Sequence, residues 1–135
     1  MEWILKTEIK DKIQVLIDNN MEEDIFRLLC NCLEKDHAFY QKAYEITGQN
    51  SFEELMSDYI YHLFLQILSK YPLKAPDKLA ILTIEAIARF YTFGLADSLK
   101  YWICQDTPFS GEEVHAAYNY IIRNSVLDLL EYPLR

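Results

Sequence analysis

A long apolar segment near the C-terminal end, residues 79–104, limits what this chain can fold into. It contains no proline and one glycine, Gly94, and aromatic side chains cluster at its centre. A helix this apolar carries more surface than one face of a small monomer can bury. A second apolar helix follows the TPFSG turn, with Val114, Tyr118 and Ile122 in helical register. Two such helices are typical of a bundle that a second copy completes, so we expect a homodimer.

Composition and charge limit the classes of protein to which the chain can belong. A length of 135 residues, with 51% apolar and 25% charged residues, indicates one globular domain, residues 1–135. The net charge of −8 argues against DNA binding by the chain itself, because neutralising phosphates requires clustered Lys and Arg. The three cysteines, Cys30, Cys32 and Cys104, form no disulfide framework. There is no signal peptide and no apolar run of the roughly 18 residues that a membrane span needs, so we expect a cytoplasmic protein.

Capping residues and prolines mark the expected helix boundaries. Asn20 with Glu23, Ser51 with Glu54 and Ser110 with Glu113 each have the spacing of a capping box. Asp36 can cap a third helix, Gly48 can end it, and Pro72 and Pro76 break the chain before the long helix. No segment shows the alternation of a strand. The sequence therefore predicts an all-α fold of six helices: 2–18, Asn20 to Glu34, 37–47, Ser51 to Tyr71, Pro76 or Asp77 to Cys104, and Ser110 to Tyr132.

Several segments resemble one family of proteins. Residues 36–64, DHAFYQKAYEITGQNSFEELMSDYIYHLF, resemble the C-terminal sensor domain of TetR-type transcriptional regulators. The similarity is greatest to the subgroup that includes regulators of dihydroxyacetone kinase operons, which tends to show an FY-x-K pair followed by a GQNSF-like turn. The FYTFGLADSLKYWI stretch and the turn at 108–113 are similar to the family's penultimate helix and its exit. The resemblance extends over nearly the whole chain.

The resemblance implies a ligand-sensing and dimerisation domain, whose last two helices form a four-helix bundle with a second copy. Such regulators bind DNA through an N-terminal unit with a helix-turn-helix, and no segment here offers a basic recognition helix after a tight turn. DNA binding is therefore expected only through a unit missing from this sequence, either because the chain is a fragment or because that unit was lost. The alternative is a DNA-free helical adaptor that binds another protein, such as a related regulator, through its C-terminal helices.

Aromatic residues are expected to line a central cavity for an unknown small-molecule effector. The chain has ten tyrosines, and rings of this kind bury a large area while their hydroxyls orient a ligand. By the resemblance, the cavity is enclosed by helices holding residues 39–44, 59–64 and 85–93. The alternative is that the rings only fill the core. The candidate ligand-binding residues are Tyr40, Tyr44, Tyr59, Phe64, Arg89, Phe90 and Tyr91.

The dimer interface is expected to centre on the last two helices. A glycine inside a helix costs about 1 kcal/mol relative to alanine, so Gly94 indicates close approach to a partner helix or to a ligand. The alternative is a tolerated glycine or a kink. The candidate interface residues are Gly94, Trp102, Tyr118, Ile122, Val126 and Leu130.

Other polar pairs are weaker candidates for chemistry. Glu85 and Arg89, one helical turn apart, could hold an anionic ligand or form a surface ion pair. Asp58 and His62 share the same spacing but lack the further Cys or His ligands of a metal site, so we expect no metal and no cofactor. The sequence also lacks a nucleophile elbow and a glycine-rich phosphate loop, so we do not expect an enzyme.

Overall fold

The computed structural model of the chain describes residues 7–74, 79–106 and 109–131. Over these residues the fold is all-α and contains six α-helices and no strand, which confirms the predicted fold class. The elements are α1 (Thr7–Asp18), η1 (Glu22–Asp24), α2 (Ile25–Lys35), α3 (His37–Glu45), α4 (Phe52–Leu68), α5 (Ile84–Ile103), α6 (Gly111–Arg123) and η2 (Val126–Leu129), where η marks a short 3-10 helix.

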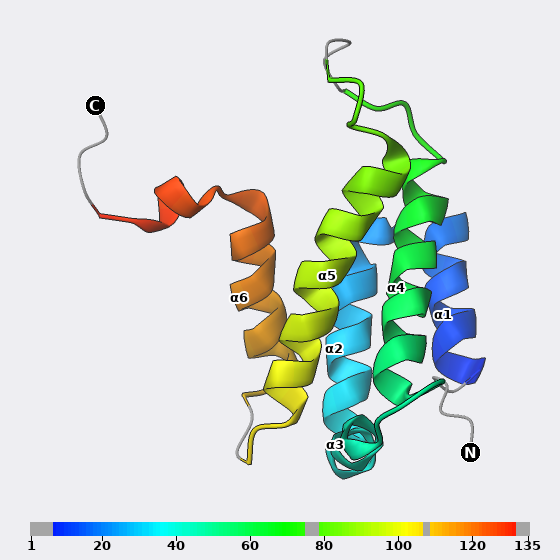
Figure 1. The fold of residues 1–135 in the computed structure, drawn as a ribbon, viewed down its shortest axis with the longest axis vertical. Coiled ribbons are helices and arrows are strands. Elements are labelled where there is room, and N and C mark those ends of the chain that lie inside the picture. Colours follow the sequence, from blue (N-terminus) through cyan, green and yellow to red (C-terminus); the bar gives the residue numbers. More distant parts are fainter. Residues whose placement is uncertain (1–6, 75–78, 107–108, 132–135) are drawn as a thin grey trace.

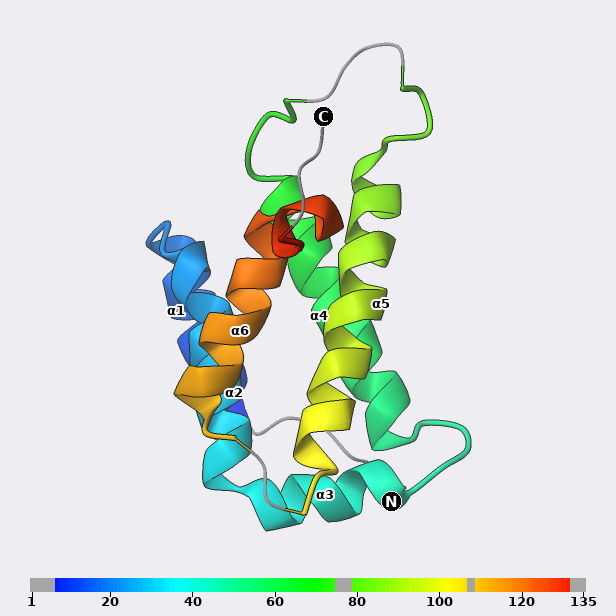
Figure 2. The same cartoon turned by 90° about the vertical axis from the view of Figure 1, so that its left-hand side faces the viewer.

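The helices form a bundle that is closed at one end. In Figures 1 and 2, α1, α2, α4, α5 and α6 run roughly along the long axis, and α3 lies across one end. The closest packing is between α4 and α5 and between α2 and α6, while α1 packs on α2. The bundle therefore contains two helix pairs, α4–α5 and α2–α6, whose facing sides enclose the core.

The helical periodicity of apolar residues explains the core. Ile9, Ile13 and Ile17 of α1 recur every four residues, so all three lie on one face, and all three are buried. The other helices add their own buried stripes. The largest fully buried side chains are Tyr40, Phe52, Ile13, Leu33, Leu99, Ile103 and Cys30.

Of the three predicted capping boxes, one forms in full and a second forms in part. The Ser110 hydroxyl accepts a hydrogen bond from the Glu113 amide at 3.1 Å, and the Glu113 carboxylate accepts one from the Ser110 amide at 3.1 Å. Ser51 caps α4 by accepting from the Glu54 amide at 3.2 Å. The Glu54 carboxylate accepts a hydrogen bond from the backbone amide of Asn50 instead of that of Ser51, so this cap is not a full box.

The predicted box at Asn20 and Glu23 is wrong. Asn20 has a left-handed backbone, with φ of 58°, and the chain forms the short helix η1 before α2 begins at Ile25. Asp36 does precede α3, but its side chain makes no capping hydrogen bond. Gly48 has the expected positive φ of 103°, although α3 has already ended at Glu45.

Three other predicted boundaries also differ. Helix α4 ends at Leu68 and not at Tyr71. Helix α5 begins at Ile84, because the Thr83 hydroxyl accepts a hydrogen bond from the Ala86 amide at 3.1 Å and so caps the helix there. The predicted start at Pro76 or Asp77 lies outside the described residues, as does the first turn of the predicted 2–18 helix.

The last predicted helix is also shorter than expected. Helix α6 ends at Arg123 because Asn124 is extended and Ser125 starts a new turn, capped by its own box with Asp128. Val126 therefore lies in η2 and Leu130 just after it. The prediction that both continue the apolar face of the last helix is wrong.

Helix α3 closes the bundle with buried tyrosines. Tyr40 and Tyr44 pack on the ring of Phe52, with centroid distances of 5.5 and 4.8 Å. A ring nitrogen of His37 lies 2.8 Å from the Ile103 carbonyl oxygen and joins α3 to the end of α5. Burial raises the pKa of Tyr40 to about 12, and burial also raises the pKa of Tyr44.

Replacement of Tyr40 by phenylalanine is expected to leave the free energy of unfolding at neutral pH unchanged or slightly raised. The Tyr40 hydroxyl is buried and has no hydrogen-bond partner among the described residues, so its removal relieves a desolvation penalty. In the wild type, the folded pKa near 12 lies above the unfolded value near 10, so stability falls as pH rises between them. Urea unfolding at pH 7 and 11 should show a smaller alkaline loss for Tyr40→Phe. An equal loss in both proteins would contradict this assignment.

Candidate functional site

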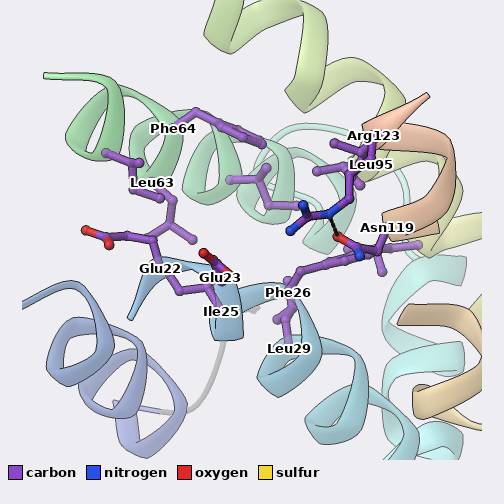
Figure 3. Close-up of a pocket in the computed structure, with 14 residues that line it drawn as sticks. Glu22, Glu23, Ile25, Phe26, Leu29, Leu63, Phe64, Leu95, Asn119 and Arg123 are labelled. Carbon is purple, nitrogen blue, oxygen red and sulfur yellow. Dashed lines mark hydrogen bonds between the residues drawn. The ribbon is translucent and has the colours of Figure 1, made fainter. Parts of the chain in front are cut away.

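An apolar pocket of about 190 Å³ lies between α2, α4, α5 and α6 (Figure 3). Its walls come from both helix pairs of the bundle, and ten of its 14 lining residues are apolar. Mostly apolar walls with a few polar groups are typical of sites for small organic molecules. The lining residues are Glu22, Glu23, Ile25, Phe26, Leu29, Ile60, Leu63, Phe64, Ile67, Leu95, Leu99, Asn119, Ile122 and Arg123.

The polar residues of the pocket lie on two of its sides. Figure 3 shows Asn119 and Arg123 of α6 on one side and Glu22 and Glu23 of η1 on the other. Arg123 and Glu23 are exposed to solvent, and the Arg123 Nε atom donates to the Asn119 Oδ1 atom at 3.4 Å. In Figure 3 the Arg123 guanidinium extends from α6 toward the opposite side of the pocket, so apolar walls are combined with a cationic group.

Buried side chains on three helices form the apolar wall. Leu29 of α2, Ile60 of α4 and Leu99 of α5 are all almost completely buried. The ring of Phe64 on α4 stacks on that of Tyr91 on α5, with centroids 5.8 Å apart. The wall is therefore built from the same packing that holds α4 and α5 together.

Glu22 connects the rim of the pocket to the ends of two helices. Its carboxylate accepts a hydrogen bond from the Lys70 ammonium at 2.6 Å and from the Tyr71 hydroxyl at 3.1 Å. Lys70 also donates to the carbonyl oxygen of Ile17 in the last turn of α1. The bond from Lys70 lowers the pKa of Glu22 and raises the pKa of Lys70. This cluster, the Glu22–Lys70 cluster, joins the ends of α1 and α4 beside the pocket.

A close contact between α2 and α6 positions the second side of the pocket. A Cβ atom on Gly111 would lie 2.8 Å from the carbonyl oxygen of Cys30, so only glycine fits without a shift. The Gly111 amide donates to Glu34 at 2.8 Å. The Glu112 carboxylate accepts a hydrogen bond from the Asn31 side-chain amide at 2.7 Å, and its other oxygen lies 3.3 Å from the Arg27 Nε atom. These bonds fix the start of α6 on α2 and so place Asn119 and Arg123 at the rim.

The predicted ligand-binding residues lie in several places. Of the seven, Phe64 lines this pocket, whereas Phe90 and Tyr91 line an open groove on another face. Tyr59 has the Lys10 ammonium 5.2 Å from its ring centroid, and Arg89 lies over the ring of Tyr61 at 5.4 Å. Tyr40 and Tyr44 belong to the aromatic cluster of α3. The sequence analysis did not predict that α2 and α6 line the pocket. The available signal was Gly111 directly after the capping residue Ser110, because a glycine there lets α6 approach α2 closely.

The groove lies on the face formed by α5, α6 and the residues that follow α6. It has a volume of about 770 Å³, and Phe90 and Phe93 at its edge are 76% and 81% exposed. A second hollow of about 420 Å³, which shares Tyr118 with the groove, continues along the same two helices. The residues of the groove are Phe90, Tyr91, Phe93, Gly94, Leu95, Ser98, Tyr118, Ile121, Ile122, Asn124, Ser125 and Val126.

Five of the six predicted interface residues line the groove or the second hollow. Gly94, Tyr118, Ile122 and Val126 line the groove, and Trp102 lines the second hollow. The Trp102 ring is buried, and its Nε1 atom donates to the Phe109 carbonyl oxygen at 2.8 Å. Leu130 is exposed beyond η2. A Cβ atom on Gly94 would have no neighbour within 4 Å, so packing inside the subunit does not require this glycine.

A family model described as a transcriptional regulator C-terminal region matches residues 19–124. The chain belongs to this TetR family. No curated protein and no solved structure matches the chain. All the lining residues of the pocket lie inside the matched TetR region, which is a regulatory region.

Two further observations concern membranes and metals. Within residues 7–74, 79–106 and 109–131, no helix has the length and apolar character that a membrane crossing requires. In the same part of the TetR region, no three His, Cys, Asp or Glu side chains are grouped so that they could hold a metal ion. A ring nitrogen of His62, one of the weaker candidates, lies 2.7 Å from the backbone carbonyl oxygen of Asp58 in the same helix.

Proposed function

We propose that this chain is the ligand-sensing and dimerisation domain of a TetR-type transcriptional regulator. The observation that supports this proposal best is the pocket between α2, α4, α5 and α6, inside the region matched by the family model. Its apolar walls and polar rim suit a small, largely apolar effector with one or two polar groups. The finer similarity of residues 36–64 to regulators of dihydroxyacetone kinase operons is part of the same proposal.

The mechanism that we propose is a shift between two arrangements of the helices. The pocket separates the α2–α6 pair from the α4–α5 pair, so a bound molecule contacts both pairs at once. A ligand that fits one spacing of the pairs better than another favours that spacing by its difference in affinity. The change would reach DNA only through an N-terminal DNA-binding unit attached to α1, since the chain itself is acidic.

The dimer that we propose is built from α5 and α6 of two copies. The exposed rings of Phe90 and Phe93 and the groove between the helices make a continuous apolar face. Extended apolar patches on a soluble domain mark interaction sites. A two-fold dimer would place α5 and α6 of each copy against those of the other and complete a four-helix bundle.

Filling the pocket should abolish effector binding. We expect a screen of small metabolites and aromatic compounds to give one that raises the melting temperature of the wild type, because only the folded state binds it. At a concentration of about 100 Kd, the gain is about 2.7 kcal/mol. Ile67 lines the pocket and is half-buried, so Ile67→Trp should fill the volume and remove this gain.

A matched substitution outside the pocket controls for the effect of tryptophan itself. Ile46 is exposed after the end of α3, and Ile46→Trp should keep the full ligand-induced shift. An equal shift in both variants would place the ligand elsewhere. If no compound in the screen stabilises the wild type, the adaptor interpretation, in which α5 and α6 bind another protein, becomes the better one.

A further inference from the structure

The chain continues after α6 as a short structured arm, which we define as residues 125–131. Ser125 and Asp128 cap its 3-10 helix, with the Asp128 carboxylate accepting from the Ser125 amide at 3.0 Å and the Ser125 hydroxyl accepting from the Asp128 amide at 3.3 Å. The arm carries four large aliphatic side chains. Val126, Leu127, Leu129 and Leu130 are 70%, 49%, 43% and 51% exposed.

The arm extends from the face that carries the groove. In Figure 1 it leaves the end of α6 and extends away from the bundle. In Figure 2, seen from that side, the arm lies at the end of α6 and in front of the end of α4, and α5 runs along one side of it. Val126, the first aliphatic residue of the arm, lines the groove together with Phe90 and Phe93. A second copy seated on the groove would therefore contact the arm.

We infer that the arm packs on the second copy, with its leucines covering the start of that copy's α5. The residues just before α5 and its second turn expose apolar side chains to match, since Ile81, Leu82 and Phe90 are 83%, 36% and 76% exposed. This patch lies toward the same end of the bundle as the arm, whereas α1 begins at the opposite end, beside α3 (Figure 1). Exchange of arms covers both patches in a two-fold dimer, because each contact occurs twice.

The orientation of the two copies rests on the proposed function. DNA-binding units attached to the two α1 helices must lie on the same side of a dimer to contact two half-sites of one operator. A two-fold axis along the bundle meets that requirement and brings the arm end of one copy to the arm end of the other. An axis across the bundle would instead bring the arm near Phe109 of the second copy, at the far end of the groove face.

Disulfide trapping between two differently tagged chains tests the exchange. One chain carries Leu129→Cys, the other carries Ile81→Cys, and both carry Cys104→Ser to remove the exposed native thiol. We expect mild oxidation of the mixed dimer to give a cross-link that joins the two tags. The control pairs Leu129→Cys with Val15→Cys, an exposed position on α1, and should give no cross-link.

The possible outcomes distinguish a failure of the arm exchange from a failure of the proposed dimer. A dimer in sedimentation, with no Leu129–Ile81 cross-link or with a cross-link to a cysteine at Phe109, overturns the arm exchange and leaves the proposed dimer intact. A monomer overturns both. As a second measurement, serine at Leu127, Leu129 and Leu130 should weaken the dimer by about tenfold for each leucine, with the melting of the monomer unchanged. Unchanged dimer affinity would also contradict the exchange.

Discussion

Replacement of Phe93 by aspartate should convert the proposed dimer to a monomer. The ring is 81% exposed in the single chain, so the subunit can accept a carboxylate there without losing core packing. In a dimer formed through α5 and α6, the same position is buried, and an unpaired buried charge costs at least about 3 kcal/mol. That cost corresponds to more than about a hundredfold increase in Kd. Sedimentation velocity across a range of concentrations measures this increase.

An aspartate on a different face shows whether the effect is local. Val15 on α1 is 57% exposed, and α1 lies on the other side of the bundle from α6 (Figure 1). The Val15→Asp variant should dimerise like the wild type and melt at nearly the same temperature. If Phe93→Asp remains a dimer, then α5 and α6 do not form the interface.

Replacement of Gly111 by alanine should destabilise the subunit. The new Cβ atom would lie 2.8 Å from the carbonyl oxygen of Cys30, which is part of the α2 backbone and cannot rotate away. Helix α6 would have to move off α2, and such overpacking costs about 1–3 kcal/mol. Urea unfolding of the monomeric Phe93→Asp background measures this loss without a contribution from dimerisation.

Gly94 offers the matched control, because a Cβ atom there has no neighbour within 4 Å. In the same monomeric background, Gly94→Ala should raise the free energy of unfolding by up to about 1 kcal/mol through helix propensity alone. Opposite signs for the two substitutions would support the contact of α6 on α2. A neutral Gly111→Ala would show that α6 does not pack this closely.

Local signals explain which parts of the fold could be predicted from the sequence. A serine followed three residues later by glutamate stabilises a helix start wherever the chain is free to form one, and Ser51 and Ser110 both do so. The same spacing at Asn20 and Glu23 did not mark a helix start, because Asn20 has a left-handed backbone and is followed by the short helix η1. The predicted end of the last helix was wrong for a similar reason. Ser125 offers a capping site that competes with continuation of the helix beyond Arg123.

The candidate site was harder to predict because it depends on contacts between distant segments. The excess of apolar residues in 79–104 does predict an exposed apolar face, and Phe90 and Phe93 lie on it. The walls of the pocket depend on where α6 packs, and that contact joins Gly111 to Cys30, far apart in the sequence. Helical periodicity shows that Leu29 faces inward but not which helix it faces.

The Glu22–Lys70 cluster would also act as a pivot for any motion of α1 relative to α4. It joins the last turn of α1 to the end of α4, beside the rim of the pocket. Helix α1 has 12 residues, and at a rise of about 1.5 Å per residue it is a rigid rod roughly 18 Å long. A rotation of about 10° around the joined end would carry Thr7, at the other end, through roughly 3 Å. A small change at the pocket would thus become a displacement of side-chain size at the start of the rod, while Ile9 and Ile13, buried nearer the joined end, would shift by less.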